Sequence, residues 1–307
     1  MSEPLFAGIE IGGTKLQIAV GDRHGRIIEK LKFKVDKQSG AAGIRNTIKH
    51  NLPTLLNGKN IKRIGVGFGG PVDWKSGKIC KSHQIEGWSG FDITAWLKEI
   101  TGIESVVEND ANTAAYGEAI CGAGRGFDPV FYVTLGSGVG GGLVVEGNIY
   151  HGREPGECEI GHVRLDKSGT TVESQCSGWA VDRKIRDAIN SNQHTKLREL
   201  AANHQGNEAI FLPQAISCND PVAIKILHET CENLAFALSH VVHLFHPQVI
   251  VLGGGLSNLG ELLRGKVAEL LPGFVMEAFH PVPEIKIAKL GEDSVPVGAI
   301  LIASQGY

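Results

Sequence analysis

A strand, a glycine-rich turn and a second strand occur in this order twice, and this repeat constrains the fold more than any other feature. The first copy spans residues 5–20 and turns at Gly12 and Gly13, and the second spans residues 131–146 and turns through residues 136–142. Alternating helix and strand patterns follow each copy. Two similar α/β lobes explain this order, with a ligand in the cleft between them, near the glycine turns.

Hydrophobic periodicity and turn residues predict the remaining elements. Strands are expected at residues 5–11, 16–20, 26–33, 61–68, 104–107, 131–135, 143–146, 248–252 and 284–288. Helices are expected at residues 41–56, 91–100, 108–121, 178–203, 208–217, 221–245, 256–271 and 297–304, and the end of the helix over 221–245 is apolar enough to be buried. We predict one domain at residues 1–112, which takes back residues 291–307, and a second at residues 113–290.

Composition restricts the class of partner. The chain has 307 residues, 42% hydrophobic and 21% charged, with a formal net charge of −3 and no basic stripe, so a nucleic-acid partner is not expected. Neither a leader peptide nor a long apolar run is recognised, so a membrane partner is not expected. The six cysteines are scattered without a CxxC pair, which favours reduced thiols in the cytoplasm.

Two glycine clusters match the dinucleotide-binding pattern G-x-G-x-x-G, at residues 65–70 and 136–141. That pattern must open a helix to bind a dinucleotide, whereas the first match runs into Pro71 and the second into a strand. An NAD-dependent dehydrogenase is therefore disfavoured. Residues 8–15 also miss the P-loop pattern, because Thr14 precedes Lys15 and a strand follows.

The glycine-rich turns at residues 12–13 and 136–142 fit phosphate-binding hairpins better than they fit tight turns alone. Backbone N–H groups in a glycine-rich turn form a concave anion site, so one hairpin in each lobe would hold the phosphates of ATP. Glu10 would face an ATP-bound Mg2+ through water, while Lys15 would either reach a phosphate or be an exposed strand lysine. A third cluster, residues 253–255, would receive adenine and ribose. The nucleotide-binding residues expected are Glu10, Gly12, Gly13, Thr14, Lys15, Gly136, Ser137, Gly138, Gly140, Gly253, Gly254 and Gly255.

The segment ENDAN at residues 108–112 places carboxylates at a strand-to-helix junction. A helix N-cap alone would explain such a carboxylate. The strand, however, is aimed at the presumed cleft, where a general base for phosphoryl transfer must reach a substrate hydroxyl. Asp110 is the candidate base, and Asn109 beside it can donate and accept hydrogen bonds to a polyol.

Glu159 and His162 lie three residues apart and would share one face of a helical turn. This pairing suits a polar ligand. Metal binding is the rival interpretation, and it needs more ligands nearby. Because residues 167–176 offer one cysteine, a structural zinc site is not expected.

Together these segments resemble the ROK family of sugar kinases, within the actin-like ATPase superfamily, over essentially the whole chain. The segments are EIGGTK at 10–15, ENDANTAAYGEA at 108–119, LGSGVGGG at 135–142, GECEIGHV at 156–163 and GGG at 253–255. The resemblance implies two actin-like, ribonuclease H-like lobes with a nucleotide and sugar cleft. It also implies transfer of the γ-phosphate of Mg-ATP to the 6-hydroxyl of a hexose, with Asp110 as base. The sugar-binding residues implied are Gly70, Pro71, Asn109, Asp110, Glu159, His162 and Glu173.

The chain departs from the family pattern at two places. Glu10 stands where the family usually has Asp, which puts the metal geometry and the ATP affinity in question. The family also commonly has a cysteine-rich zinc motif after the histidine; residues 171–173 (TVE) keep its Glu and lose its cysteines. The loop after His162 would then be held by packing.

The resemblance leaves the substrate open. Glucose is the first expectation, an N-acetylhexosamine the second, and a fructokinase activity also fits the family. It favours a homodimer, and it disfavours a DNA-binding role because only four residues precede the first expected strand. A nucleotide-binding or sugar-binding sensor without kinase activity is the alternative from another class.

Overall fold

The computed structural model describes residues 3–80, 82, 85–154, 156, 158–191, 194–202 and 204–306. The chain forms two compact units. Unit 1 comprises Met1–Gly126, Gly142–Cys158 and Lys289–Tyr307, and unit 2 comprises Phe127–Gly141 and Glu159–Ala288. The predicted division at residue 112 stays a prediction.

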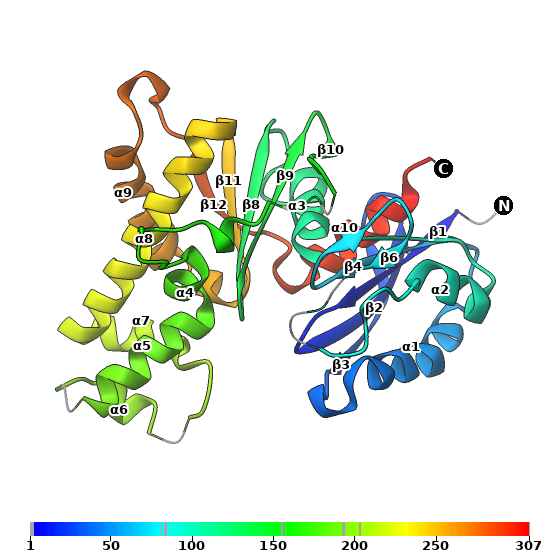
Figure 1. Ribbon diagram of the computed structural model, residues 1–307, viewed down its shortest axis with the longest axis horizontal. Coiled ribbons are helices and arrows are strands. Elements are labelled where there is room, and N and C mark those ends of the chain that lie inside the picture. The colour runs from blue at the N-terminus through cyan, green and yellow to red at the C-terminus, as the bar shows by residue number, and fades with distance from the viewer. Residues whose placement is uncertain are drawn as a thin grey trace. The chain divides into compact units, whose positions relative to one another are not determined.

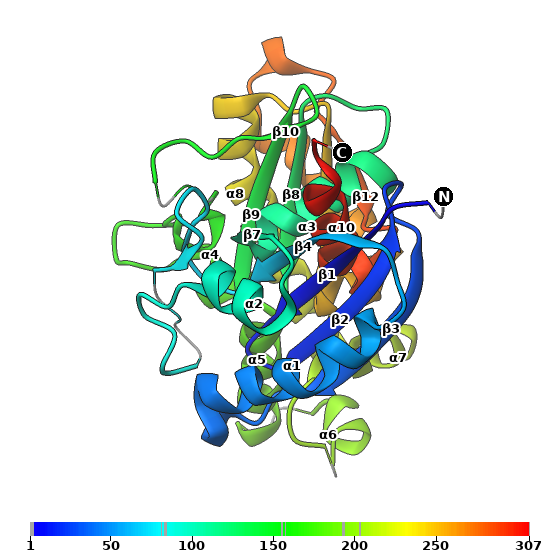
Figure 2. The same cartoon turned by 90° about the vertical axis from the view of Figure 1, so that its right-hand side faces the viewer.

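Unit 1 is built on a five-stranded sheet in the order β3-β2-β1-β4-β7, in which β3 to β4 are labelled in Figure 1 and β7 in Figure 2. The first three strands form an antiparallel meander, and β4 and β7 extend it in parallel. A short ribbon of β5 and β6 follows β4. The strands are β1 (Leu5–Ile11), β2 (Lys15–Asp22), β3 (Ile27–Lys34), β4 (Ile61–Phe68), β5 (Val72–Asp73), β6 (Lys78–Ile79) and β7 (Ser105–Asn109).

Helices cover both faces of this sheet (Figure 2). The helices α1 (Gly40–Leu56) and α2 (Ile93–Thr101) share one apolar core with the sheet, and α3 (Asp110–Cys121) and α10 (Ser294–Ser304) pack together on the opposite face. A Cβ on Gly65 would lie 2.0 Å from the carbonyl oxygen of Ala299. Glycine at this position therefore lets the backbone of α10 lie directly on the sheet.

A second sheet has the order β10-β9-β8-β11-β12, with β11 parallel to both β8 and β12. Its strands are β8 (Val130–Leu135), β9 (Val139–Val145), β10 (Asn148–Ile149), β11 (Val249–Gly253) and β12 (Glu284–Ile287). The boundary between the units falls within β9, after Gly141. The fully buried core of β11, from Val249 to Leu252, is apolar throughout, as expected of a strand covered on both faces.

The α-helices of unit 2 are α4 (Val172–Cys176), α5 (Gly178–Asn190), α6 (Leu197–Leu200), α7 (Leu212–Ser217), α8 (Pro221–Phe245) and α9 (Glu261–Leu270). Short 3-10 helices complete the fold at Lys37–Ser39 and Gly291–Asp293 of unit 1, and in unit 2 at Ile160–His162, Glu208–Phe211, Gly255–Leu259, Leu271–Phe274 and Glu277–Phe279. None of the helices that the structure describes is long and apolar enough to cross a membrane.

Most predicted elements are confirmed within a few residues, but four helical predictions are wrong. The helix expected over 256–271 is divided, because a 3-10 helix spans Gly255–Leu259 and α9 begins at Glu261, after Gly260. The helix expected over 178–203 ends at Asn190, where Ser and Asn disfavour a helical interior, and its predicted last residue, Asn203, lies outside the described residues. The helix expected over 208–217 is two elements, a 3-10 helix over Glu208–Phe211 and then α7 from Leu212, whose first turn contains Pro213. The end of α8 is not buried: Leu244 is 74% exposed, since it lies off the stripe formed by Leu234 and Leu238.

Candidate active site

The first glycine turn joins β1 to β2 at the surface of unit 1. The N–H of Gly12 donates to the carbonyl of Lys15 across 3.0 Å, which closes the turn. Gly12 and Gly13 are half-buried and Thr14 is exposed. A ligand can therefore approach the backbone of this turn, as a phosphate site requires.

Glu10 lies beneath that turn, 6% exposed. Lys15 Nζ lies 3.1 Å from its Oε1, and Gln17 Nε2 donates to its Oε2 across 2.6 Å. Gln17 Nε2 also donates to the carbonyl of Glu292. Burial raises the pKa of Glu10 above its ordinary value, and the charge of Lys15 and the hydrogen bond from Gln17 oppose that rise.

Lys15 is thus an ion-pair partner of Glu10 in this structure, an outcome that neither predicted role describes. A carboxylate offers about four lone-pair sites, and only two donors are described here. Glu10 therefore retains acceptor capacity for a water bound to Mg2+, and its chemistry fits the predicted metal contact. Among the residues that the structure describes, no group of three His, Cys, Asp or Glu side chains could hold a metal ion.

The junction of β7 and α3 is capped by Asn109, not by a carboxylate. Asn109 Oδ1 accepts from the N–H groups of Ala111 and Asn112, and its Nδ2 donates to the carbonyl of Gly70 across 3.3 Å. Asp110 is the first residue of α3, where the helix dipole favours negative charge. Asn109, and not Asp110, therefore caps α3, so helix capping does not explain the carboxylate at position 110.

Asp110 lies beside the first glycine turn. A Cβ built on Gly69 would be 3.3 Å from Asp110 Oδ2 and 3.6 Å from the Cα of Gly12. The N–H of Gly69 donates to the carbonyl of Ile11 across 2.8 Å, which ties this segment to the end of β1. Gly70 and Pro71 follow, both half-buried. The fold of unit 1 thus brings together a carboxylate, a glycine turn and the predicted sugar-pocket segment.

The second glycine turn, between β8 and β9, is braced inside unit 2. The N–H of Gly136 donates to Gly138 O and the N–H of Gly178 donates to Gly136 O. The carboxylate of Glu173 accepts from the N–H of Val139 across 3.0 Å. Ser137, Gly138 and Gly140 are half-buried. Glu173, which was predicted to hold a sugar, therefore contacts the turn itself through one oxygen.

The third glycine cluster ends β11. Gly254 has φ +79°, and a Cβ there would lie 2.5 Å from the backbone nitrogen of Leu135. A side chain at this position would require an unfavourable backbone conformation, and it would also clash with the backbone of Leu135. A Cβ on Gly255 would meet nothing within 4 Å, so the backbone there is open to a ligand.

Glu159 precedes the short helix Ile160–His162 at the surface of unit 2, and His162 is the last residue of that helix. His162 Nε2 lies 3.9 Å from Glu159 Oε2, and their side chains are 69% and 47% exposed. A Cβ on Gly161 would be 2.1 Å from the carbonyl oxygen of Val139, so this segment packs on β9. Glu157 of the same motif lies outside the described residues.

Hydrogen bonds, rather than packing alone, hold the loop after His162. Asp166 accepts from Ser168 Oγ at 2.6 Å and from the N–H groups of Gly169 and Thr170. Hydrogen bonds from the side chain of Ser168 first, and then from Thr170, hold the pKa of Asp166 well below its usual range. Thr171 then opens α4 with a capping box. A polar turn thus closes the loop where the family pattern has cysteines.

We expect Asp166→Ala to open this turn without unfolding unit 2. Amide hydrogen exchange at Gly169 and Thr170 should become faster by about 10-fold, while the melting temperature changes little, because Asp166 is exposed. The folded-state pKa is depressed, so the stabilisation is complete above the unfolded pKa and is lost as pH falls through the folded value. In the wild type, exchange protection should therefore persist at neutral pH and weaken only in acid. Equal protection in both proteins at pH 7 would contradict this role; Ser168→Ala is the milder control.

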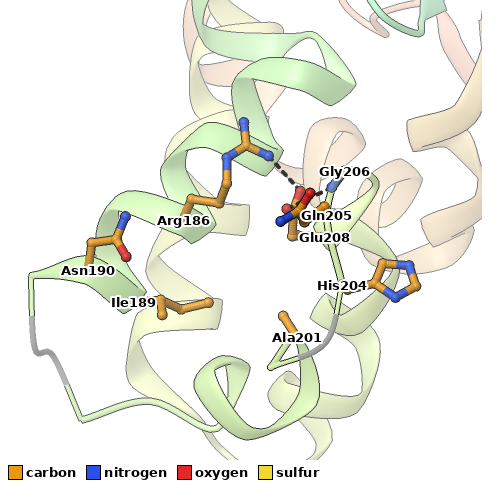
Figure 3. A pocket seen from close by; sticks show the side chains of 8 residues that line it. All are labelled: Arg186, Ile189, Asn190, Ala201, His204, Gln205, Gly206 and Glu208. Atoms are coloured by element: carbon orange, nitrogen blue, oxygen red, sulfur yellow. Dashed lines mark hydrogen bonds and ion pairs between the residues drawn. The ribbon is translucent and has the colours of Figure 1, made fainter.

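Unit 2 also contains a cavity of about 430 Å³ between α5 and the segment before α7 (Figure 3). Arg186 at its rim pairs with the buried Glu208 across 2.7 Å. None of the predicted site residues lines it. Its lining residues are Arg186, Ile189, Asn190, Ala201, His204, Gln205, Gly206 and Glu208.

Comparison with known proteins points in one direction. The model of the ROK family matches residues 6–306. The glucokinase of Thermotoga maritima is 28% identical over 306 residues, which cover 97% of this chain and 96% of that protein. The glucokinase of Halalkalibacterium halodurans is 30% identical over 319 residues, which cover 99% and 96%. The N-acetylgalactosamine kinase AgaK of a Shewanella species is 25% identical over 310 residues, which cover 97% and 96%.

Solved structures agree. A ROK family glucokinase from Streptomyces griseus, in complex with glucose and AMPPNP, superposes with a TM-score of 0.87 at 30% identity, and the match covers 98% of this chain and all of that one. The ROK hexokinase of Thermus thermophilus gives a TM-score of 0.76 at 27% identity, with 97% of each chain covered. These matches confirm the predicted α/β class and its actin-like type.

Proposed function

Because the chain belongs to the ROK family, we propose that it is an ATP-dependent hexose kinase that transfers the γ-phosphate of Mg-ATP to the 6-hydroxyl of a hexose. The observation that carries this proposal is the position of Asp110, whose Oδ2 lies beside Gly69 and the glycine turn at Gly12. A general base and a phosphate-binding backbone are thereby adjacent in unit 1. Phosphoryl transfer needs this positioning more than it needs covalent chemistry from the protein.

Asp110 would accept the proton of the sugar 6-hydroxyl as that oxygen attacks the γ-phosphorus. The oxygen forms the new P–O bond, the bond to the β-phosphate oxygen breaks, and ADP leaves. Mg2+ bound to ATP would supply charge neutralisation at the phosphates, with Glu10 reaching it through water. The proposed nucleotide contacts in unit 1 are Gly12, Gly13, Thr14 and Lys15, and in unit 2 Gly136, Ser137, Gly138, Gly140, Gly253, Gly254 and Gly255.

The capping role of Asn109 limits its contact with a sugar. Its Oδ1 already accepts two helix N–H groups, so its Nδ2, held by Gly70 O at 3.3 Å, is the group available to a sugar hydroxyl. Glu159 and His162 have exposed polar ends and are the proposed partners of the other hydroxyls, with Glu173 contributing its second oxygen. Gly70 and Pro71 would line the sugar pocket.

Glucose is the first candidate substrate, since two glucokinases and a glucose-bound glucokinase structure are among the relatives. An N-acetylhexosamine is the second, supported by the likeness to AgaK, and fructose the third, supported by a fructokinase of Pediococcus pentosaceus at 28% identity. We also propose a homodimer that works in the cytoplasm, where ATP and reduced cysteines suit the predicted chemistry.

A sugar panel tests the function. ADP release from Mg-ATP is measured with glucose, mannose, fructose, N-acetylglucosamine and N-acetylmannosamine separately. We expect glucose to raise the rate above that without sugar by about 100-fold or more, because a closed site excludes water and suppresses ATP hydrolysis. ATP binding without stimulation by any of these sugars would favour the sensor instead.

A further inference from the structure

A buried polar network lies directly behind the junction that carries Asp110. Glu108, on β7, is 5% exposed. Its Oε1 accepts from the backbone N–H of Asn109 at 2.8 Å and from Asn112 Nδ2 at 3.1 Å. Asn112 Nδ2 also donates to the carbonyl of Gly156. One carboxylate oxygen therefore holds both the start of α3 and, through Asn112, the loop after β10.

The other oxygen of Glu108 is held by His151 from that same loop. His151 Nε2 lies 2.5 Å from Glu108 Oε2, and an ionised carboxylate can only accept, so the ring nitrogen donates. The imidazole stacks on Trp74, with ring centroids 4.2 Å apart and an interplanar angle of 17°. Three segments of unit 1 that are distant in sequence thus meet at one histidine.

This network is costly to bury. Asn112 Oδ1 and Trp74 Nε1 are both buried without a hydrogen-bond partner among the described residues. An apolar cluster of the same volume would avoid that cost. Unpaired buried polar atoms reduce stability. Where they lie directly behind a reacting group such as Asp110, they are typical of a site that maintains a particular side-chain geometry at the cost of stability.

We propose that His151 is a positioning residue for phosphoryl transfer, which fixes Glu108 and, through it, the Asn109–Asp110 junction. The proposal rests on the proposed kinase function and adds a residue to it. Glu108 holds the peptide N–H of Asn109; the Asn109 side chain in turn holds the first turn of α3 and the carbonyl of Gly70. If Glu108 were released, Asp110 would lose the support that aims its carboxylate past Gly69.

The hydrogen bond and the stacking of His151 can be separated by two substitutions. His151→Phe keeps an aromatic ring on Trp74 and removes the donor to Glu108. His151→Gln loses the ring and places an amide N–H near the position of Nε2. His50→Phe, on the exposed side of α1, is the matched control for a change of histidine to phenylalanine.

We expect His151→Phe to lower kcat by about 10-fold to 100-fold with KM for ATP and hexose nearly unchanged, since a misaimed base slows chemistry without weakening binding. His151→Gln should recover kcat to within about 3-fold of the wild type, because the donor is restored. His151→Phe also removes the described donor to the buried Oε2 of Glu108, so its melting temperature should fall and should recover in His151→Gln. Rates are therefore measured well below the unfolding transition of each variant, and His50→Phe should match the wild type throughout.

Two outcomes would overturn the proposal. His151→Phe could retain the wild-type kcat, in which case a loss confined to His151→Gln would leave stacking as the cause. Alternatively, His151→Phe could raise KM for both substrates as well as lower kcat, with no recovery in His151→Gln, as a merely structural residue would. A double variant with Glu108→Gln should be no slower than the slower single variant, because both changes break one contact. A wild type without sugar-stimulated ADP release would instead overturn the kinase function, and the positioning role with it.

Discussion

The Asp110→Asn variant is expected to bind ATP and hexose but to release ADP about 100-fold to 10,000-fold more slowly than the wild type. Asparagine has nearly the same shape, so the contact beside Gly69 can persist. Its amide cannot take a proton, so the attacking hydroxyl loses its base. A loss in kcat with an unchanged KM would identify an interaction made only in the transition state. The measurement is steady-state ADP release with the preferred sugar.

A structural explanation for that loss can be excluded by the unfolding temperature. Asp110 occupies the first position of α3, where removal of a negative charge costs about 0.3–1 kcal/mol. We expect a correspondingly small change in melting temperature. Glu99→Gln, an exposed carboxylate of α2, is the control and should keep full activity. General base catalysis contributes about 100-fold or more to a rate. If Asp110→Asn kept kcat within about 3-fold of the wild type, Asp110 would therefore not be the base.

The Glu118→Gln variant is expected to lose stability more than any other single change considered. Glu118 is fully buried on α3. Its Oε2 accepts from the N–H groups of Ala123 and Lys289, and its Oε1 accepts from the N–H of Leu290 and from Ser294 Oγ. The chain first leaves unit 1 after Gly126 and returns to it for the last time at Lys289, so one carboxylate holds the backbone near the first and the last of its four crossings.

An amide cannot replace this carboxylate. Three of the four neighbours are backbone N–H groups, which can only donate, and the NH2 group of glutamine would face at least one of them without an acceptor. Removing such a buried acceptor leaves several donors unpaired, and we expect a loss of about 3 kcal/mol or more in the free energy of unfolding. Urea or thermal unfolding of Glu118→Gln and Glu118→Ala measures it. Ser294→Ala, which removes only one donor, should cost about 1 kcal/mol. If Glu118→Gln lowered the free energy of unfolding by less than about 1 kcal/mol, the anchoring role would be refuted.

Local sequence patterns predicted much of the fold. Alternation of apolar residues predicted β1 and β4 to the residue, and Asp92 was correctly expected to open α2, where its side chain accepts from Ala95 N. The glycine turn at 12–13 was placed between the right strands, whereas of the turn expected at 136–142 only residues 136–138 lie between β8 and β9, which begins at Val139. These features depend on hydrogen bonds between near neighbours, so the residue types that satisfy them recur at fixed short spacing.

Helix ends were predicted less well, because their signals compete. Residues 178–203 have helical spacing, but the helix ends at Asn190, where the N–H of Ser191 bonds to Asp187 O. The exposure of Leu244 was missed because an apolar composition does not say which side of a helix has a partner.

The sequence by itself determined on which elements the candidate site residues lie: glycine turns follow buried strands, and Asn109 and Asp110 stand at the end of a strand. Only the tertiary structure decided how they are used. Asn109 rather than Asp110 caps α3, Lys15 pairs with Glu10, and Glu118 meets Lys289 across a separation of 171 residues. Such contacts leave no periodic trace in the chain, because they form only after strands and helices pack and bury polar groups that must then find partners.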